Sequence, residues 1–270
     1  MMFELIDKNG LRFLKSDKIL SRHGFSTRIG GVSELEYTKE LNLAYGRGDS
    51  EDIVCKNVEL FAKAMEVDLE KIISVPQIHS NLVRTVDDEH AGEGVFKKYT
   101  LECDGYITER QGLPVAVKTA DCVPILLEAR DNENNVIGVS AVHAGWRGTA
   151  DKIAKVTVDK LVALSVSVEN IYVAIGPCID ECCYEVGNDF ANTIEEKLGQ
   201  NYEKLFVKTK ENGTLYADLK GMNIEILKSC GVPLENIDVC SYCTCCNGEL
   251  FYSHRRQKGK RGAMMNLICK

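Results

Sequence analysis

The sequence predicts a single α+β domain with mixed or antiparallel sheets. Short apolar runs typical of strands outnumber helical patterns along the 270 residues, and the two kinds of segment do not alternate strictly. A doubly wound parallel sheet would require that alternation. No internal repeat, low-complexity tract or Pro/Ser-rich linker divides the chain. We therefore expect one domain that spans residues 1–270.

The expected strands are short apolar runs bounded by turn residues. They lie near residues 72–77, 82–86, 104–108, 114–118, 123–129, 136–142, 171–175, 236–240, 249–253 and 263–268.

The expected helices show apolar side chains at helical spacing. Residues 51–66 follow Ser50, whose hydroxyl suits a helix N-cap. A Gly-Val-Pro sequence is a typical stop signal at the end of the last helix. The other expected helices are residues 149–164, 189–198 and 218–230.

Composition limits the classes of function. The formal net charge of −7 argues against a protein that binds nucleic acid through its phosphate backbone. One basic stretch, Arg255–Arg261, is either a solvated loop or a local anion site. The hydrophobic content of 44% is ordinary for a globular protein and supports a sizeable core.

The twelve cysteines do not suggest a secreted disulfide framework. The N-terminal segment is acidic and lacks a signal-peptide core, and no apolar run is long enough to span a membrane. We therefore expect a cytoplasmic protein with reduced thiols, most of them small buried hydrophobes.

The segment His143–Thr149 is the strongest local indication of a site. It connects a predicted strand to a predicted helix, and its glycines at 145 and 148 allow the backbone to approach a ligand closely. The N-terminus of the following helix would direct N–H groups at an anion. The alternative is a tight turn with a hydrogen-bonded histidine and a packed tryptophan.

Three residues at predicted strand ends are candidate metal ligands: His79, Cys122 and His143. Their separations of 43 and 21 residues match no local zinc motif, so spacing alone does not support a site. If they converge, two imidazoles and one thiolate leave one position open on a tetrahedral ion, as catalysis requires. Each could instead be an ordinary core or surface residue.

Several ordered motifs together carry a family resemblance that covers residues 20 to 268. They are Phe25–Ser33, Leu41–Leu43, Gln77–His79, Thr119–Pro124, His143–Gly148, Ile175–Ile179 and Phe251–Arg256. This set resembles the family once labelled multicopper polyphenol oxidase, or laccase-like. Its members are now regarded as purine nucleoside phosphorylases that also deaminate adenosine.

The resemblance implies a β-sandwich-like core flanked by helices and a metal, usually zinc, held by His79, Cys122 and His143. It implies purine nucleosides and phosphate as substrates, with methylthioadenosine as a further candidate, and a monomer or homodimer. His254 departs from the tyrosine that members often have before the paired arginines. Candidate substrate-binding residues in the matched motifs are Arg28, Arg147 and Arg255 for phosphate, Trp146 for stacking on the base, and Asn42.

Counting residues tests the chemistry that the family labels suggest. Five histidines cannot furnish several imidazole-rich copper centres, although a single His₂Cys site could hold copper in place of zinc. The H-x-E motif of the common zinc deaminases is missing. Deamination would therefore use another arrangement, in which an activated water attacks C6 of adenosine and Asp121 moves protons. Asp121 could instead bond to N–H groups of its own turn.

Two other functions remain open. Cys122 with a histidine base could perform thiol hydrolysis or deamidation, as in certain toxin deamidases that the family resembles. The cysteine content also suits a metal- or redox-sensing binding protein. Four of the thiols lie within Cys240–Cys246 and could form a structural zinc or cluster site if Cys178 or the Cys182–Cys183 pair folds close.

Overall fold

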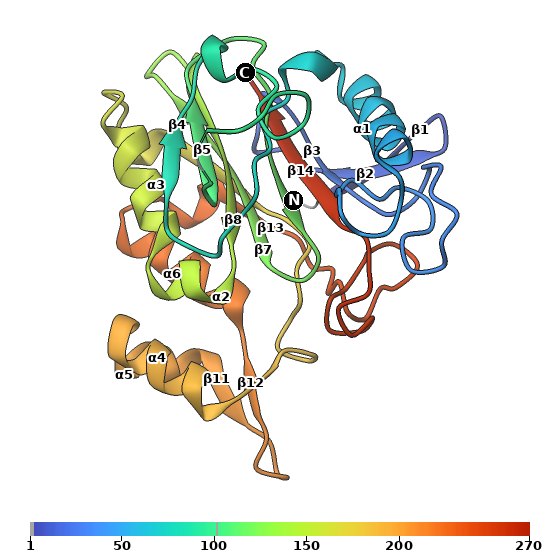
Figure 1. Cartoon of the computed structure of the whole chain (residues 1–270). Helices are drawn as coiled ribbons and strands as arrows, with labels where there is room; N and C mark the ends of the chain where they lie inside the picture. The colour runs from blue at the N-terminus through green and yellow to red at the C-terminus, as the bar shows by residue number, and fades with distance from the viewer. Residues whose placement is uncertain (1–2, 101) are drawn as a thin grey trace.

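Two β-sheets stacked face to face form the centre of the molecule, and helices cover their outer faces (Figure 1). The structure is a computed structural model and describes residues 3–100 and 102–270. One sheet has the order β1-β2-β3-β14-β6, and the other has the order β13-β9-β7-β8-β5-β4. Only β4–β5 and β9–β13 pair in parallel in these two sheets. The expected α+β fold with mixed sheets is therefore confirmed.

The strands are short, and the longest lie in the middle of the six-stranded sheet. Their bounds are β1 Glu4–Lys8, β2 Leu11–Lys15, β3 Arg22–Ser26, β4 Val83–Thr85, β5 Gly105–Thr108, β6 Val115–Thr119, β7 Val123–Arg130, β8 Val136–Ala144, β9 Ile171–Ile175, β10 Glu185–Val186, β11 Val207–Thr209, β12 Leu215–Ala217, β13 Ile237–Val239 and β14 Met264–Cys269.

Six α-helices accompany these strands in the described residues. They are α1 Glu51–Met65, α2 Trp146–Ala150, α3 Ile153–Val162, α4 Asn188–Leu198, α5 Gln200–Phe206 and α6 Leu219–Ser229. Short 3₁₀ turns occur at Leu69–Lys71, Asp88–His90, Val168–Asn170 and Leu234–Asn236. None of these helices is long and apolar enough to cross a membrane.

Alternating side chains of the central strands build two separate core layers. In β7, Ile125 and Leu127 face the helices α3 and α6, whereas Leu126 faces the other sheet. In β14, Ile268 packs between the sheets and Leu267 packs toward α1. This period of two, with both faces buried, explains why these strands read as nearly continuous apolar runs.

A smaller unit extends from one end of the sandwich (Figure 1). It consists of the helices α4 and α5 and a three-stranded sheet of order β10-β12-β11. Phe190 and Ile194 of α4 join the same apolar cluster as the outer face of the six-stranded sheet. The unit is therefore packed onto the main body through shared core residues.

Several sequence predictions about individual elements are wrong. Residues 72–77 form only one isolated bridge, Ile73 to Val115, and residues 249–253 are an irregular loop. The predicted helix 149–164 is two helices, because Lys152 adopts a left-handed conformation with φ 58° between them. The strands β1 to β3, the small sheet and α5 were not predicted.

Candidate metal and ligand site

Three side chains from separate parts of the fold meet at one end of the sandwich. His79 lies in the loop before β4, Cys122 in the turn between β6 and β7, and His143 near the end of β8. Their possible ligand atoms all lie within 4.8 Å of one another. The two imidazole rings stand at 90° with centroids 4.9 Å apart. The structure thus brings together the three residues that the sequence nominated.

Asp104, which the sequence did not nominate, holds two of these residues in place. Its carboxylate is fully buried and accepts a hydrogen bond from His143 Nδ1 at 2.8 Å. It also accepts the backbone N–H groups of His79 at 3.0 Å and Ser80 at 2.7 Å. His79 itself has φ 60°, a strained conformation for a non-glycine residue. The carboxylate therefore fixes both the orientation of one imidazole and the turn that presents the other.

The protonation states of the site are coupled. Burial alone would raise the pKa of Cys122, but the charge of His143 and hydrogen bonds from both histidines lower it to about 6. Burial alone would lower the pKa of His143, but the Cys122 thiolate and the Asp104 carboxylate raise it to about 9. The site therefore favours a thiolate at neutral pH, which is the form that binds metal or attacks an electrophile.

Gly145 is needed for the close packing of these three side chains. A Cβ atom at this position would lie 3.0 Å from His79 Cδ2, 3.3 Å from His143 Cε1 and 3.6 Å from Cys122 Sγ. Gly148 is also tightly packed, because its Cβ would lie 2.7 Å from the Ser80 carbonyl oxygen. The glycines of the His143–Thr149 segment thus allow the backbone to approach the site itself.

The donor set and its surroundings fit a catalytic zinc ion. Zinc binds imidazole nitrogen and thiolate sulfur, and three protein ligands leave one of four tetrahedral positions open. The Nδ1 of His143 is occupied by Asp104, so its Nε2 is left for a metal, as is typical of histidine ligands. The same residues could also bind copper, which nitrogen and sulfur ligands generally bind more tightly than zinc.

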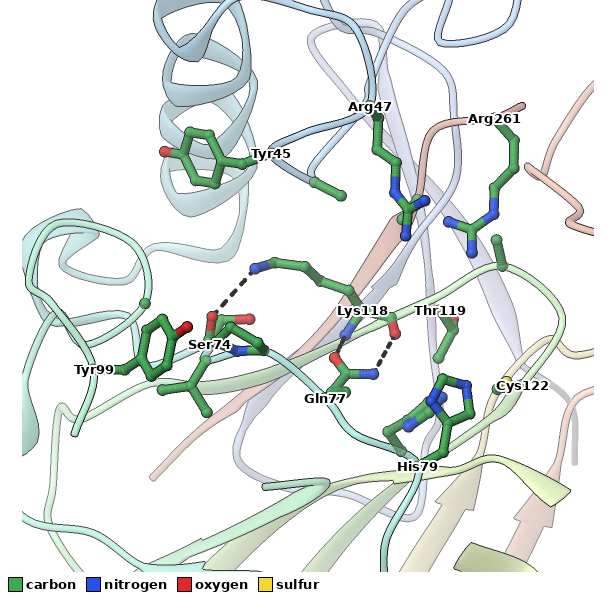
Figure 2. A pocket seen from close by; sticks show the side chains of 17 residues that line it. Tyr45, Arg47, Ser74, Gln77, His79, Tyr99, Lys118, Thr119, Cys122 and Arg261 are labelled. Atoms are coloured by element: carbon green, nitrogen blue, oxygen red, sulfur yellow. Dashed lines mark hydrogen bonds between the residues drawn. The ribbon is translucent and has the colours of Figure 1, made fainter. Parts of the chain in front are cut away.

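A cavity of about 440 Å³ opens beside the three residues (Figure 2). His79 and Cys122 lie at one end, and Tyr45 and Tyr99 lie at the other. This volume falls in the range of small-molecule sites. The remaining lining residues are Ala44, Arg47, Ser74, Val75, Pro76, Gln77, Gly94, Lys118, Thr119, Ala120, His143, Arg261 and Ala263.

Two arginines that the sequence did not nominate individually make one wall of this cavity basic. Figure 2 shows the guanidinium groups of Arg47 and Arg261 pointing toward the same space. Among residues 3–100 and 102–270, the exposed Arg47 has no hydrogen-bond or ion-pair partner. Arg261 donates through one guanidinium N–H to the Gly262 carbonyl at 3.0 Å, and its Nε is buried without a partner. Burial and the charge of Arg47 lower the pKa of Arg261 to about 10. Two neighbouring guanidinium groups of this kind could donate hydrogen bonds to one anion.

Lys118 adds a third cationic group to the cavity. The backbone N–H of Lys118 donates to the Gln77 side-chain carbonyl, and the Gln77 side-chain NH₂ donates to the Lys118 carbonyl. Nζ of Lys118 donates to the Ser74 carbonyl at 3.2 Å. Burial of the ammonium group lowers its pKa to about 8. Its charge is therefore sensitive to pH in the mildly alkaline range.

Asp121 lies beside the site but does not line the cavity. It has φ 103° and is buried, and each of its carboxylate oxygens accepts a hydrogen bond at 2.7 Å, one from Thr244 Oγ1 and one from the Arg255 backbone N–H. These contacts hold the turn from which the next residue, Cys122, projects.

The other residues nominated for substrate binding lie outside the cavity lining. Arg28 donates to the carbonyls of Gly248 and Lys39, and Arg255 donates to those of Cys183 and Glu185. The side-chain amide of the fully buried Asn42 is hydrogen-bonded to the backbone of Ala44 and Ala263 and to the Asp49 carboxylate. His254, the departure from the family pattern, is exposed and also outside it.

Trp146 and Arg147 form a stacked pair that does not line the cavity. The guanidinium carbon of Arg147 lies 4.2 Å from the indole centroid, and Trp146 packs on Phe190 with centroids 5.5 Å apart. Both lie in α2, which has only five residues. The helix whose N–H groups were expected to face an anion is therefore short, and anion binding there stays a prediction.

The fold and the site define a class of protein. It is an α+β sandwich with a single His₂Cys group beside a ligand-sized, partly basic cavity. The chain belongs to the family described as multi-copper polyphenol oxidoreductase laccase, whose model matches residues 22–270. The resemblance expected from the sequence motifs is confirmed.

The similarity to other proteins covers most of the chain. An adenosine deaminase named RL5, from an unknown prokaryotic organism, is 32% identical over 254 residues, which cover 93% of this chain and 94% of that protein. The purine nucleoside phosphorylase YlmD of Bacillus subtilis is 33% identical over 248 residues, 91% of this chain and 87% of that protein. The crystal structure of YlmD from Geobacillus stearothermophilus superposes with a TM-score of 0.90 at 31% identity, covering 100% of this chain and 98% of that one.

Proposed function

We propose that the protein is a zinc-dependent purine nucleoside phosphorylase with an adenosine deaminase side activity. The observation that carries this proposal is the cavity that joins the His₂Cys group to two neighbouring arginines, Arg47 and Arg261. Relatives named purine nucleoside phosphorylase and adenosine deaminase support the same pair of activities.

The geometry suggests how the two substrates divide the cavity. Phosphate, the nucleophile of phosphorolysis, would bind the guanidinium groups of Arg47 and Arg261, which can donate bidentate hydrogen bonds. The purine would bind at the opposite end, which Tyr45 and Tyr99 line with aromatic surface. Holding both reactants in one cavity replaces a bimolecular encounter by an oriented one.

His79, Cys122 and His143 would hold zinc, which when bound supplies Lewis acidity and an open coordination position. Asp104 would keep His143 in the tautomer that presents Nε2, and it would keep the His79 turn in its strained conformation. Asp121 would act as a positioning residue for Cys122, because both of its carboxylate oxygens are bonded to neighbouring segments. Inosine, guanosine, adenosine and methylthioadenosine are the candidate nucleosides.

The copper oxidase chemistry named in the family description is not the function that these residues favour. Several copper centres require many imidazoles, and the other three histidines lie elsewhere. His23 is buried and bonded to Ser16 and Ser21, and His90 caps a 3₁₀ turn.

The proposal is tested by incubating the pure protein with inosine, with and without phosphate, after metal removal and after zinc restoration. We expect hypoxanthine and ribose 1-phosphate only with phosphate and zinc together. Inorganic phosphate that leaves the rate of hypoxanthine release unchanged would refute the phosphorylase activity. Zinc analysis of His79→Ala and His143→Ala supplies the control, since equal zinc in both variants and wild type would refute the site.

A second candidate function rests on the line Cys122, His143 and Asp104. A thiol with lowered pKa, an imidazole and a carboxylate in this order resemble the arrangement of thiol hydrolases. This function predicts hydrolysis of an amide that survives complete metal removal and is lost on alkylation of Cys122. Amide hydrolysis abolished by a chelator and restored by zinc would exclude it.

A further inference from the structure

Four cysteines from two distant segments form a second cluster, outside the cavity. Cys182 and Cys183 follow β9, and Cys243 and Cys246 follow β13. Their sulfur atoms all lie within 4.8 Å of one another. Cys246 Sγ lies 3.6 Å from Cys182 Sγ and 3.3 Å from Cys183 Sγ, and the last two are 3.6 Å apart.

These separations distinguish between the possible states of the thiols. A disulfide would bring two sulfurs to about 2.05 Å. Four thiolates around one zinc ion, each with a Zn–S bond of about 2.3 Å, lie about 3.8 Å apart because of tetrahedral geometry. The sulfurs around a four-iron cluster bind different irons and lie farther apart than this. The observed spacing fits a single shared ion.

The surroundings of the cluster suit a doubly negative tetrathiolate site. The backbone N–H of Asp180 donates to Cys243 Sγ at 3.4 Å. Two guanidinium groups approach the same loops, one from Arg255 to the Cys183 carbonyl at 3.2 Å and one from Arg256 to the Cys245 carbonyl at 3.0 Å. Hydrogen bonds to sulfur and nearby cations both stabilise thiolate charge.

We propose that Cys182, Cys183, Cys243 and Cys246 bind a structural zinc ion, separate from the ion at the His₂Cys site. All four positions of a tetrahedral ion are filled by protein sulfur, so this site is closed to substrate. Cys245, next to Cys246 in the chain, lies outside the group of four.

A zinc ion bound at this cluster would also affect the His₂Cys site. The two segments that it would join, around Cys182 and around Cys243, both donate hydrogen bonds to Asp121. Thr244 Oγ1 donates to the Asp121 carboxylate at 2.7 Å, and the Ile179 N–H donates to the Asp121 carbonyl at 2.9 Å. A zinc ion between these segments would therefore stabilise the turn that projects Cys122.

The first experiment counts zinc in a chain whose His₂Cys site is disabled. The variant His79→Ala/His143→Ala, purified from zinc-containing medium, is expected to retain one zinc ion per chain. Adding Cys182→Ser or Cys246→Ser should remove that ion, whereas adding Cys55→Ser, a half-buried thiol in α1, should not. No zinc in the histidine variant, or zinc retained after the cluster substitutions, would overturn the proposal.

The second experiment uses the wild-type chain and does not depend on a variant that folds. Loaded with ¹¹³Cd²⁺, it should show one NMR resonance in the far-downfield region typical of four sulfur ligands. No resonance in that region would overturn the proposal. A Cys183–Cys246 or Cys182–Cys246 disulfide, detected by peptide mass analysis of unreduced protein, would overturn it as well. Neither experiment measures nucleoside turnover, so failure of the proposed function would leave both results interpretable.

Discussion

The carboxylate of Asp104 and the imidazole of His143 form a buried hydrogen bond of 2.8 Å. The backbone N–H of His143 also donates to the Asp104 carbonyl at 2.7 Å. Both contacts follow from the pairing of β5 with β8, in which Gly105 lies opposite Val142. The strand register thus places a carboxylate behind a candidate metal ligand, an arrangement that orients the imidazole and increases its basicity.

The substitution Asp104→Asn should therefore weaken metal binding without unfolding the protein. An amide cannot accept all the hydrogen bonds that the carboxylate receives, and it removes the charge that favours the His143 Nδ1–H. Losses of such partners typically cost about 10-fold to 100-fold in metal affinity or activity. Competition with a chromogenic chelator measures zinc affinity directly.

The matched control for this prediction is Asp159→Asn, an exposed carboxylate in α3 that pairs with Lys155 at 2.7 Å. It should leave zinc affinity unchanged. If Asp104→Asn retained wild-type zinc affinity while circular dichroism showed a folded chain, the positioning role of Asp104 would be wrong.

The substitution Gly145→Ala should disturb the site by steric contact alone. Its added Cβ would lie 3.0 Å from His79 and 3.3 Å from His143, so the ligand side chains must move apart. We expect lower zinc occupancy and a loss of turnover of about 10-fold or more, since small displacements in an active site are costly.

Gly187→Ala is the control for this crowding effect. Gly187 also precedes a helix with a negative φ of −91°, but its Cβ would meet only the movable side chain of Asp189. This variant should keep its zinc and activity. Equal zinc occupancy in Gly145→Ala and Gly187→Ala would show that the packing at Gly145 is not limiting.

The three candidate metal ligands could be predicted from the sequence, but the carboxylate that positions them could not. His143 follows a clear strand, so its position at a strand end was recognisable from the apolar pattern. His79 and Cys122 carry no local signal at separations of 43 and 21 residues, and only the family motifs connected them. Asp104 became recognisable only with the β5–β8 register, because nothing in the sequence pairs residue 104 with residue 143.

The basic wall was beyond local sequence reasoning for a similar reason. Arg47 and Arg261 belong to loops 214 residues apart that meet where the Leu43 N–H donates to the Ala263 carbonyl at 3.1 Å. The only signals were the glycines that flank Arg47 and the basic stretch that ends at Arg261. Arg28 and Arg255 lie in the family motifs, yet their guanidinium groups donate to backbone carbonyls.

The errors in secondary structure also have physical causes. The strand β1, Glu4–Lys8, is a largely exposed edge strand with few apolar residues, so its pattern is weak. The segment 249–253 looks like a strand because Phe251 and Tyr252 are apolar and buried. They anchor a loop instead, and the Tyr252 hydroxyl lies 2.7 Å from the Thr38 carbonyl to which it donates.

Replacing either cavity arginine should raise the KM for phosphate more than the KM for inosine. Arg47→Gln and Arg261→Gln each remove one of the two guanidinium groups that point into the cavity. Loss of a hydrogen bond to a charged group costs about 1.5–3 kcal/mol, which corresponds to about 10-fold to 100-fold in affinity. Initial rates over a phosphate series at saturating inosine give the values.

The control variant Arg28→Gln distinguishes a loss of phosphate binding from a general loss of stability. Its guanidinium stacks on Tyr252 and donates to two carbonyls, so we expect a lower Tm and an unchanged KM for phosphate. A phosphate KM that rose equally in all three variants would argue against a specific anion site at Arg47 and Arg261.

Lys118 should give phosphate binding a pH dependence in the mildly alkaline range. Burial lowers the pKa of its ammonium group from 10.5 to about 8, so it loses its charge as the pH rises through 8. The cavity then becomes less positive, and the KM for phosphate should rise between about pH 7.5 and 9. The depressed pKa also means that unfolding takes up a proton in the window from about 8 to 10.5, so the contribution of Lys118 to stability increases with pH there. Lys118→Met, which keeps most of the length of the side chain but not its charge, should have a higher KM at pH 7.5 and a flatter pH profile. Parallel profiles in wild type and variant would assign the pH dependence to another group.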